Sequence, residues 1–190
     1  MLTPQQRRTL LHVARHALRH AVGAGPSPDL ETDDPDLLQD SGAFVTLTLN
    51  GQLRGCIGHI QPVYPLIETV ALMAREAALE DPRFMPVTRD EEPRISLEIS
   101  VMSPVTPVPD LELIEVGRHG LVVEQGMRRG LLLPQVATEW GWTRKEFLQH
   151  TCMKAGLPGD AYLKGAQVSW FEAEVFNEDE ETENNTGRYN

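Results

Sequence analysis

The sequence contains little cysteine and no long run of apolar residues. Cys56 and Cys152 are its only two cysteines, and they stand far apart in a chain of 190 residues. Such usage does not indicate the disulfide framework of a small secreted domain. An apolar signal segment and a stretch long enough to cross a bilayer are also missing. We therefore expect a cytoplasmic protein with reduced thiols and no membrane association.

The sequence also lacks the motifs of common cofactor and metal sites. It has no glycine-rich phosphate loop, dinucleotide fingerprint, pair of zinc-binding cysteines or serine elbow, so we expect no cofactor. His12, His16 and His20 recur every four residues and could form a metal-binding stripe on one side of a helix. No carboxylate or cysteine accompanies them to complete and orient a site. We interpret the stripe as an exposed helix face.

Basic residues are in the minority. The chain has 17 Lys and Arg against 28 Asp and Glu, a formal net charge of -11. Duplex nucleic acid is therefore not the expected partner, because phosphate binding needs clustered basic residues. Residues 1–22 hold four arginines and no acid, which leaves single-stranded nucleic-acid binding as a weaker alternative. Residues 177–190 are acidic and poor in apolar residues, which is typical of a disordered tail.

The remaining chain, residues 1–176, has the length and apolar content of one domain, which could divide into two lobes. Capping boxes at Thr3 and Thr143 each mark the start of a helix. Apolar periodicity predicts further helices over 35–39 and 65–80, and strands over 44–49, 53–57, 95–101, 121–124, 131–133 and 168–176. Prolines 104 and 107 are expected to end the third strand. Strands in antiparallel groups, without strict βαβ alternation, predict an α+β fold.

The first predicted hairpin contains the most informative residues. Asn50-Gly51 between two apolar runs is a strong hairpin signal, because both central residues of a type I′ turn need positive φ. A two-residue turn predicts these opposite pairs: Leu49 with Gln52, Leu47 with Arg54, and Val45 with Cys56. In that register Arg54 and Cys56 share one face of the sheet with Leu49.

The hairpin places a guanidinium close to a thiol, which would favour the reactive and metal-ligating thiolate form of Cys56. Gly55 and Gly58 flank the cysteine, at positions where a ligand or a neighbouring chain could approach the backbone closely. The alternative is a buried structural thiol, with Arg54 paired to a carboxylate.

Three other residues could join Cys56. His119, which is followed by Gly120, and His59, three residues after Cys56, are candidate proton carriers, although His119 could equally be a surface turn residue. Arg83 follows the helix stop Asp81-Pro82 and could bind a ligand or pair with the helix end. Cys152 falls on the apolar side of its predicted helix, so we expect it in the core.

The motif Leu53-Arg54-Gly55-Cys56-Ile57-Gly58 resembles the hallmark hexapeptide of the AMMECR domain family, protein A of the AmmeMemoRadiSam system. Further stretches resemble that family's blocks in order and spacing: Asp81–Phe84 with Pro86, Thr88–Glu91, Val116–Gly120, Leu133–Ala137, Gly141–Trp142 and Cys152–Leu157. The resemblance runs from about Thr3 to Phe176. It implies an α+β domain of unestablished activity, with a cleft beside Leu53–Gly58 and with Memo-like and radical-SAM proteins as partners in a shared pathway.

Two functions follow as hypotheses. The first is an enzyme or enzyme subunit acting on a small molecule or macromolecule, with Cys56, His119 and Arg54 as catalytic residues. In it, the binding residues are Gly55, Gly58, His59 and Arg83. The second is a non-catalytic module that docks a partner protein in an apolar or peptide-shaped groove.

Overall fold

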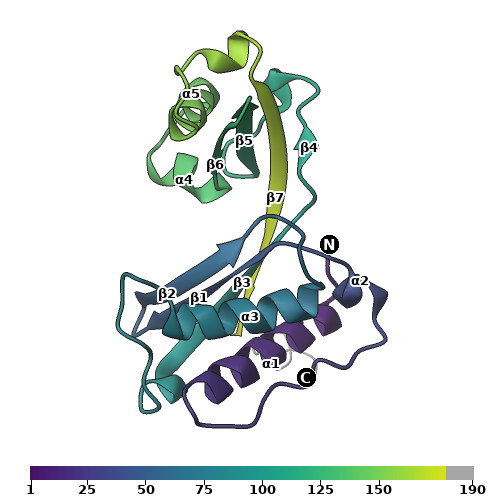
Figure 1. Ribbon diagram of the computed structural model, residues 1–190, viewed down its shortest axis with the longest axis vertical. Coiled ribbons are helices and arrows are strands. Elements are labelled where there is room, and N and C mark those ends of the chain that lie inside the picture. Colours follow the sequence, from purple (N-terminus) through teal and green to yellow (C-terminus); the bar gives the residue numbers. More distant parts are fainter. Residues whose placement is uncertain (179–190) are drawn as a thin grey trace, which may run out of the picture. The chain divides into compact units, whose positions relative to one another are not determined.

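The computed structural model describes residues 1–178, which form two compact units (Figure 1). Unit 1 comprises residues 1–102 and the chain from 174 onward, and unit 2 comprises residues 103–173. The acidic tail expected over 177–190 lies almost entirely outside the described residues.

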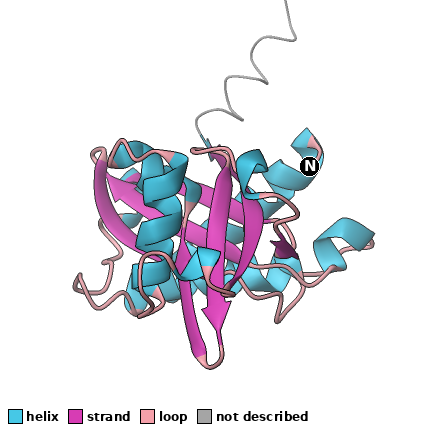
Figure 2. Ribbon diagram, turned by 90° about the horizontal axis from the view of Figure 1, so that it is seen from above, coloured by secondary structure: helices cyan, strands magenta, loops and turns pink. Residues whose placement is uncertain are grey.

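Most predicted elements appear close to their expected bounds (Figure 2). Unit 1 contains α1 (Pro4–Ala21), α2 (Pro35–Leu38), β1 (Ala43–Leu49), β2 (Gln52–His59), α3 (Leu66–Leu79) and β3 (Ile95–Met102). Unit 2 contains β4 (Thr106–Pro107), β5 (His119–Gln125), β6 (Arg128–Leu132), α4 (Pro134–Glu139) and α5 (Arg144–Lys154). The strand β7 (Gln167–Asn177) contributes to both units. Short 3₁₀ turns lie at Glu92–Arg94, Leu111–Leu113 and Ala161–Leu163.

The strands are arranged in the order β2-β1-β3-β7 in unit 1 and β7-β5-β6 in unit 2, with β4 also on β7. The pairings β1–β2, β1–β3, β5–β6, β5–β7 and β4–β7 are all antiparallel, which confirms the α+β class. β3 ends at Met102, just before Pro104, which confirms the expected end of this strand. A further short strand follows it. Thr106 and Pro107 pair with β7, because proline is tolerated where its missing N–H faces away from the ladder. Within residues 1–178, no helix combines the length and apolarity that a membrane span requires.

Helices α1 and α3 pack against each other and cover one face of the unit 1 sheet, α3 on β1 and β2 and α1 on β3 (Figure 1). The predicted capping box starts α1: Gln6 N donates to Thr3 Oγ1 at 3.3 Å, and Thr3 N donates to Gln6 Oε1 at 2.8 Å. Val45 and Leu47 of β1 are fully buried beneath the helices, whereas Thr46 between them is only half-buried. The sheet therefore has one core face and one partly open face.

The β1–β2 hairpin turns at Asn50 and Gly51, whose φ values of 53° and 75° confirm the expected turn. The pair Leu49–Gln52 is also confirmed, but the register beyond it is wrong. A bulge makes Arg54 an extra residue, so Leu47 lies opposite Gly55, Thr46 opposite Cys56, and Val45 opposite Ile57.

The bulge moves Cys56 to the opposite face from the predicted one. Because the pairing shifts by one residue and side chains alternate with a period of two, Cys56 lies with Thr46 on the partly open face. Gly55 takes the core face instead. A Cβ on Gly55 would lie 2.1 Å from the Ala77 carbonyl oxygen of α3, so glycine is required where the strand meets the helix.

Unit 2 encloses its own core between the β5–β6 hairpin and α5. The predicted Thr143 capping box starts α5, with Thr143 N donating to Glu146 Oε2 at 2.8 Å. Cys152 is completely buried, as expected for a core residue. Burial raises the pKa of the Cys152 thiol, so this cysteine is suited to packing rather than reaction.

We expect Gly55→Ala to lower the free energy of unfolding by about 1–3 kcal/mol, because its Cβ would push α3 away from β2. Gly25→Ala is the control in the same unit, because a Cβ there would approach Arg19 Cβ only to 3.4 Å. The control should change stability by less than about 1 kcal/mol. Urea denaturation would measure both, and equal effects would contradict the close-packing role of Gly55.

Candidate functional site

Cys56 lies half-exposed on β2, the outer strand of the unit 1 sheet. Its Sγ accepts a hydrogen bond from Thr46 Oγ1 at 3.3 Å. Thr46 lies opposite Cys56 on β1 and opposite Glu98 on β3. Opposite residues project from the same face of an antiparallel sheet, so these three polar side chains form a row across three strands.

The backbone of Cys56 is held by the segment that follows α3. Asp81 Oδ2 accepts a hydrogen bond from Cys56 N at 2.8 Å, and Arg83 Nη2 donates to Cys56 O at 3.3 Å. Arg83 also pairs with Asp81, with Nη2 and Oδ2 2.7 Å apart. The backbone N–H and carbonyl of Cys56, on the outer edge of β2, thus have the hydrogen-bond partners that a neighbouring strand would otherwise supply.

Asp81 is the important residue that the sequence analysis missed as part of the site. Its side chain is only 2% exposed. The hydrogen bond from Arg83 is the main reason that the pKa of Asp81 stays well below its usual range, and the Cys56 N–H adds to the effect. The block Asp81-Pro82-Arg83-Phe84 could have pointed to it, but its sequence does not show that the carboxylate turns back to β2.

Arg83, rather than Arg54, is the guanidinium that interacts with Cys56. The pKa of Arg83 is raised, mainly by its hydrogen bond with Asp81, and smaller contributions come from Cys56. The Arg83 side chain is 53% exposed. It can therefore remain bound to Asp81 while it faces a ligand.

Arg54 has a structural role in the observed contacts, which corrects its prediction as the thiolate partner. Its four hydrogen bonds all go to the segment 85–91: two to the Glu91 carboxylate, at 2.9 and 3.1 Å, and one each to the carbonyls of Met85 and Pro86. The bulge directs this side chain along the edge of the sheet. The alternative from the sequence, an arginine paired with a carboxylate, is what the structure shows.

The two predicted histidines do not share the face of Cys56 within unit 1. His59 lies opposite the buried Ala43 and so projects from the core face of β2. Its Nδ1 lies 2.7 Å from Gln61 O, and its Nε2 is buried without a hydrogen-bond partner among the described residues. His119 belongs to unit 2, so its catalytic pairing with Cys56 remains a prediction.

His119 begins β5 and is 5% exposed, so the alternative of a surface turn residue is wrong. Its Nδ1 accepts a hydrogen bond from Glu115 N at 3.0 Å, and its ring lies 4.4 Å from that of Trp170. A pocket of about 340 Å³ adjoins it within unit 2. Arg118 lines this pocket together with the two carboxylates that it binds, Glu115 at 3.1 Å and Glu172 at 3.0 Å.

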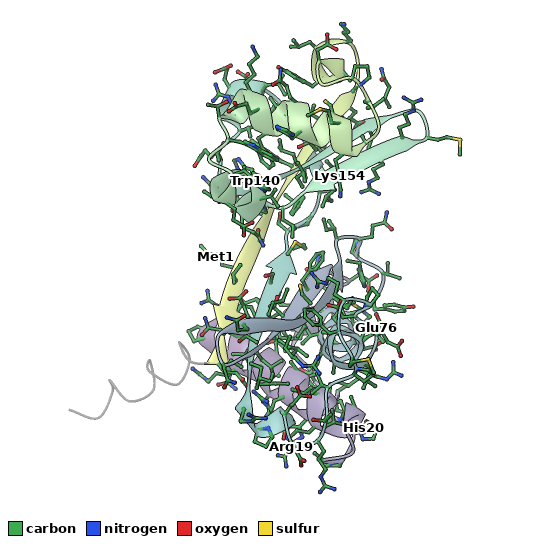
Figure 3. All side chains as sticks on the ribbon, turned by 90° about the vertical axis from the view of Figure 1, so that its left-hand side faces the viewer. Met1, Arg19, His20, Glu76, Trp140 and Lys154 are labelled. Atoms are coloured by element: carbon green, nitrogen blue, oxygen red, sulfur yellow. The ribbon has the colours of Figure 1, made fainter. Side chains whose placement is uncertain are left out.

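The histidine stripe of α1 does not assemble a metal centre in the described part of the chain. His12 and His16 place their rings 4.2 Å apart, and His20 Nδ1 lies 3.3 Å from Gly25 O. Figure 3 shows His20 beside Arg19 at the end of α1. Across residues 1–178, no group of three or more His, Cys, Asp or Glu side chains is placed to hold a metal ion.

Comparisons with known proteins cover nearly the whole chain. A family model described as AMMECR1 matches residues 11–176. A protein of Methanothermobacter thermautotrophicus is 47% identical over 187 residues, which are 94% of this chain and 97% of that protein. A protein of Pyrococcus furiosus is 43% identical over 182 residues, 90% of this chain and 87% of that protein. The crystal structure of an uncharacterized protein from Pyrococcus horikoshii matches with a TM-score of 0.75 and 41% identity, over 89% of both chains.

The Arg54–Glu91 pair predicts a specific loss of stability in acid. Hydrogen bonds, first from Arg54 and then from Thr88 N, lower the pKa of Glu91 to about 2. A carboxylate whose pKa is lower in the folded state stabilises the fold fully above its unfolded pKa of about 4.3. That contribution disappears as the pH falls from there toward about 2.

We therefore expect Glu91→Gln to lower the free energy of unfolding by roughly 1–3 kcal/mol at pH 7, with the difference from wild type shrinking below pH ~4.3. Denaturant titrations between pH 7 and pH ~2.5 would measure it. Glu31→Gln, at an exposed loop position, is the control and should be nearly neutral. A deficit for Glu91→Gln that stays constant across the acid range would contradict the assigned role of the pair.

Proposed function

The chain belongs to the AMMECR1 family, and on that premise we propose that it is a cysteine-dependent enzyme or enzyme subunit whose nucleophile is Cys56. One observation carries the proposal: three residues fix the half-exposed cysteine. Thr46 donates to its sulfur, Asp81 accepts from its N–H, and Arg83 donates to its carbonyl oxygen. A nucleophile held in one orientation meets its substrate at a low entropic cost.

The same contacts suggest how the thiol is activated. A hydroxyl that donates to sulfur stabilises the thiolate more than the thiol, and a neighbouring guanidinium acts in the same direction. Thr46 supplies the first interaction and Arg83 the second. In this proposal the half-exposed thiol first gives its proton to water, and the Thr46 hydroxyl then donates to the thiolate.

Arg83 also suggests the substrate class. A guanidinium that is half-exposed beside a nucleophile can bind a carboxylate or phosphate group. The proposed substrate is therefore an anionic small molecule or macromolecular group with an electrophilic carbon. The sulfur–carbon bond forms as the leaving group departs with its electron pair. The involvement of Memo-like and radical-SAM proteins in the same pathway is part of this proposal and rests only on the sequence resemblance of Leu53–Gly58 and its accompanying blocks.

The proposal predicts that Cys56 is alkylated faster at pH 7 than an ordinary exposed thiol. The rate would be measured with iodoacetamide between pH 5 and 10 in a Cys152→Ala background, so that only one thiol remains. We expect Thr46→Val and Arg83→Gln each to slow the reaction at pH 7 by about 5- to 10-fold, since each removes an interaction worth about 1 kcal/mol with the thiolate.

Arg89→Gln is the matched control, because it removes an exposed arginine from the same loop without touching the site. It should leave the rate unchanged. If Cys56 reacts only when the protein unfolds, Cys56 is not an activated nucleophile. The same conclusion follows if Thr46→Val and Arg83→Gln both react as fast as the parent protein.

A second function, docking of a partner protein, is favoured by a mainly apolar groove of about 350 Å³ within unit 1. Leu30, Tyr64, Ala71 and Leu72 line it, with Glu68 and Arg75 among the charged residues there. An apolar groove with a few charges suits a helical or extended peptide segment. Here we expect Tyr64→Glu to weaken binding to a purified Memo-like protein, whereas Met127→Glu at the exposed β5–β6 turn should not. Equal binding by both variants would exclude this groove.

Nucleic-acid binding receives no support from the basic first helix. Arg7 pairs with Glu174, Arg15 with Glu92 and Glu178, and Arg19 approaches Glu92 at 4.0 Å. Phosphate groups would have to displace these carboxylates.

A further inference from the structure

The hydrogen bonds of His119 determine which of its ring nitrogens carries a proton. A backbone N–H can only donate, so Nδ1, which accepts from Glu115 N at 3.0 Å, must present its lone pair. In the neutral ring the proton is then on Nε2. His119 is therefore held as an Nε2–H donor, and it can act as a base only if it first breaks the bond to Glu115.

This donor has no acceptor of its own. Nε2 is 3.7 Å from Glu172 Oε1, which is beyond hydrogen-bond length, and no other partner of Nε2 is present among the described residues. The His119 side chain is nevertheless only 6% exposed. His119 and Glu172 both line the pocket of unit 2, so an Nε2–H without a protein acceptor is available there to a ligand. An incoming oxygen atom would satisfy it.

The pocket offers both kinds of polar group. Nε2–H of His119 and the guanidinium of Arg118 are donors, and the carboxylates of Glu115 and Glu172 are acceptors. Trp170 supplies an aromatic wall, and its Nε1 is already bonded to Thr106 Oγ1 at 3.0 Å. Two carboxylates against one guanidinium leave a net negative charge, which disfavours a ligand that is only an anion.

We propose that this pocket binds a small zwitterion of the free amino acid type. Its carboxylate would accept from His119 Nε2–H and Arg118, and its ammonium group would lie against Glu172, which is 49% exposed and able to reorient. The volume of about 340 Å³ is within the usual range for small-molecule sites. The site is separate from the chemistry proposed for Cys56, and neither inference depends on the other.

The first part of the test reads the tautomer directly. Two-dimensional NMR of ¹⁵N-labelled protein, through the long-range couplings of the His119 ring, should show Nε2 protonated and Nδ1 unprotonated at neutral pH. Nδ1 protonated in the neutral ring would overturn the proposal, because the donor would then not face the pocket.

The second part measures binding by calorimetry. The probes are the free L-amino acids, each compared with its matched carboxylic acid and amine, such as L-leucine with 4-methylpentanoate and 3-methylbutylamine. We expect at least one amino acid to bind saturably and both of its partial analogues to bind at least tenfold more weakly. If no amino acid binds, or an analogue equals its amino acid, the zwitterion site is excluded.

The variant His119→Asn sharpens this test. The Asn oxygen can take the place of Nδ1 and accept from Glu115 N, so the local fold keeps its hydrogen bond while the donor into the pocket is lost. We expect a dissociation constant at least tenfold higher for the bound amino acid. Arg129→Gln, which breaks an exposed ion pair with Glu124 outside the pocket, should bind like wild type. Unchanged binding by a folded His119→Asn variant would overturn the assignment.

Discussion

The hydrogen bond from the Cys56 N–H to the buried carboxylate of Asp81 is the interaction on which the unit 1 site depends. Burying a carboxylate is costly unless it is paired and hydrogen-bonded. Asp81 meets that requirement with Arg83 on one side and the edge of β2 on the other. The end of α3, the outer strand and the orientation of Cys56 are thereby fixed together. The same contact brings Arg83 to the cysteine.

The sequence predicted the elements well where local chemistry determines them. Thr3 and Thr143 start helices because each capping box lies within four residues, and Asn50-Gly51 forms its turn for the same local reason. The bulge at Arg54 could not be predicted in this way. It depends on Glu91 holding the arginine and on α3 approaching Gly55. Since strand faces alternate, this single tertiary effect reversed the predicted face of Cys56.

Of the residues around Cys56, the sequence analysis named Arg83 but not Asp81 or Thr46, and it paired the cysteine with a different arginine. Cys56 and Arg83 come together, whereas proximity in sequence selected Arg54, which lies only two residues from the cysteine. A short distance along the sequence does not predict which side chains make contact. A long arginine side chain can reach away from its neighbours in sequence to bind a carboxylate on another segment. Asp81 was missed for the reverse reason. Nothing in its local sequence shows that an acid after a helix will become a partner of a strand edge.

The Cys56 site and the His119 site differ in which group the backbone contact fixes. This difference determines the chemistry that each site can support. At Cys56 the side chain of Asp81 accepts a hydrogen bond from the backbone N–H. The sulfur atom itself accepts a hydrogen bond from the hydroxyl of Thr46. At His119 a backbone N–H holds the side chain, which occupies the one lone pair that a neutral imidazole could use as a base. The first arrangement supports the proposed nucleophile, and the second supports the proposed binding of a ligand by an Nε2–H donor. The nucleophile proposed at Cys56 is therefore argued without His119, and the contacts that orient it, from Thr46, Asp81 and Arg83, all lie within unit 1.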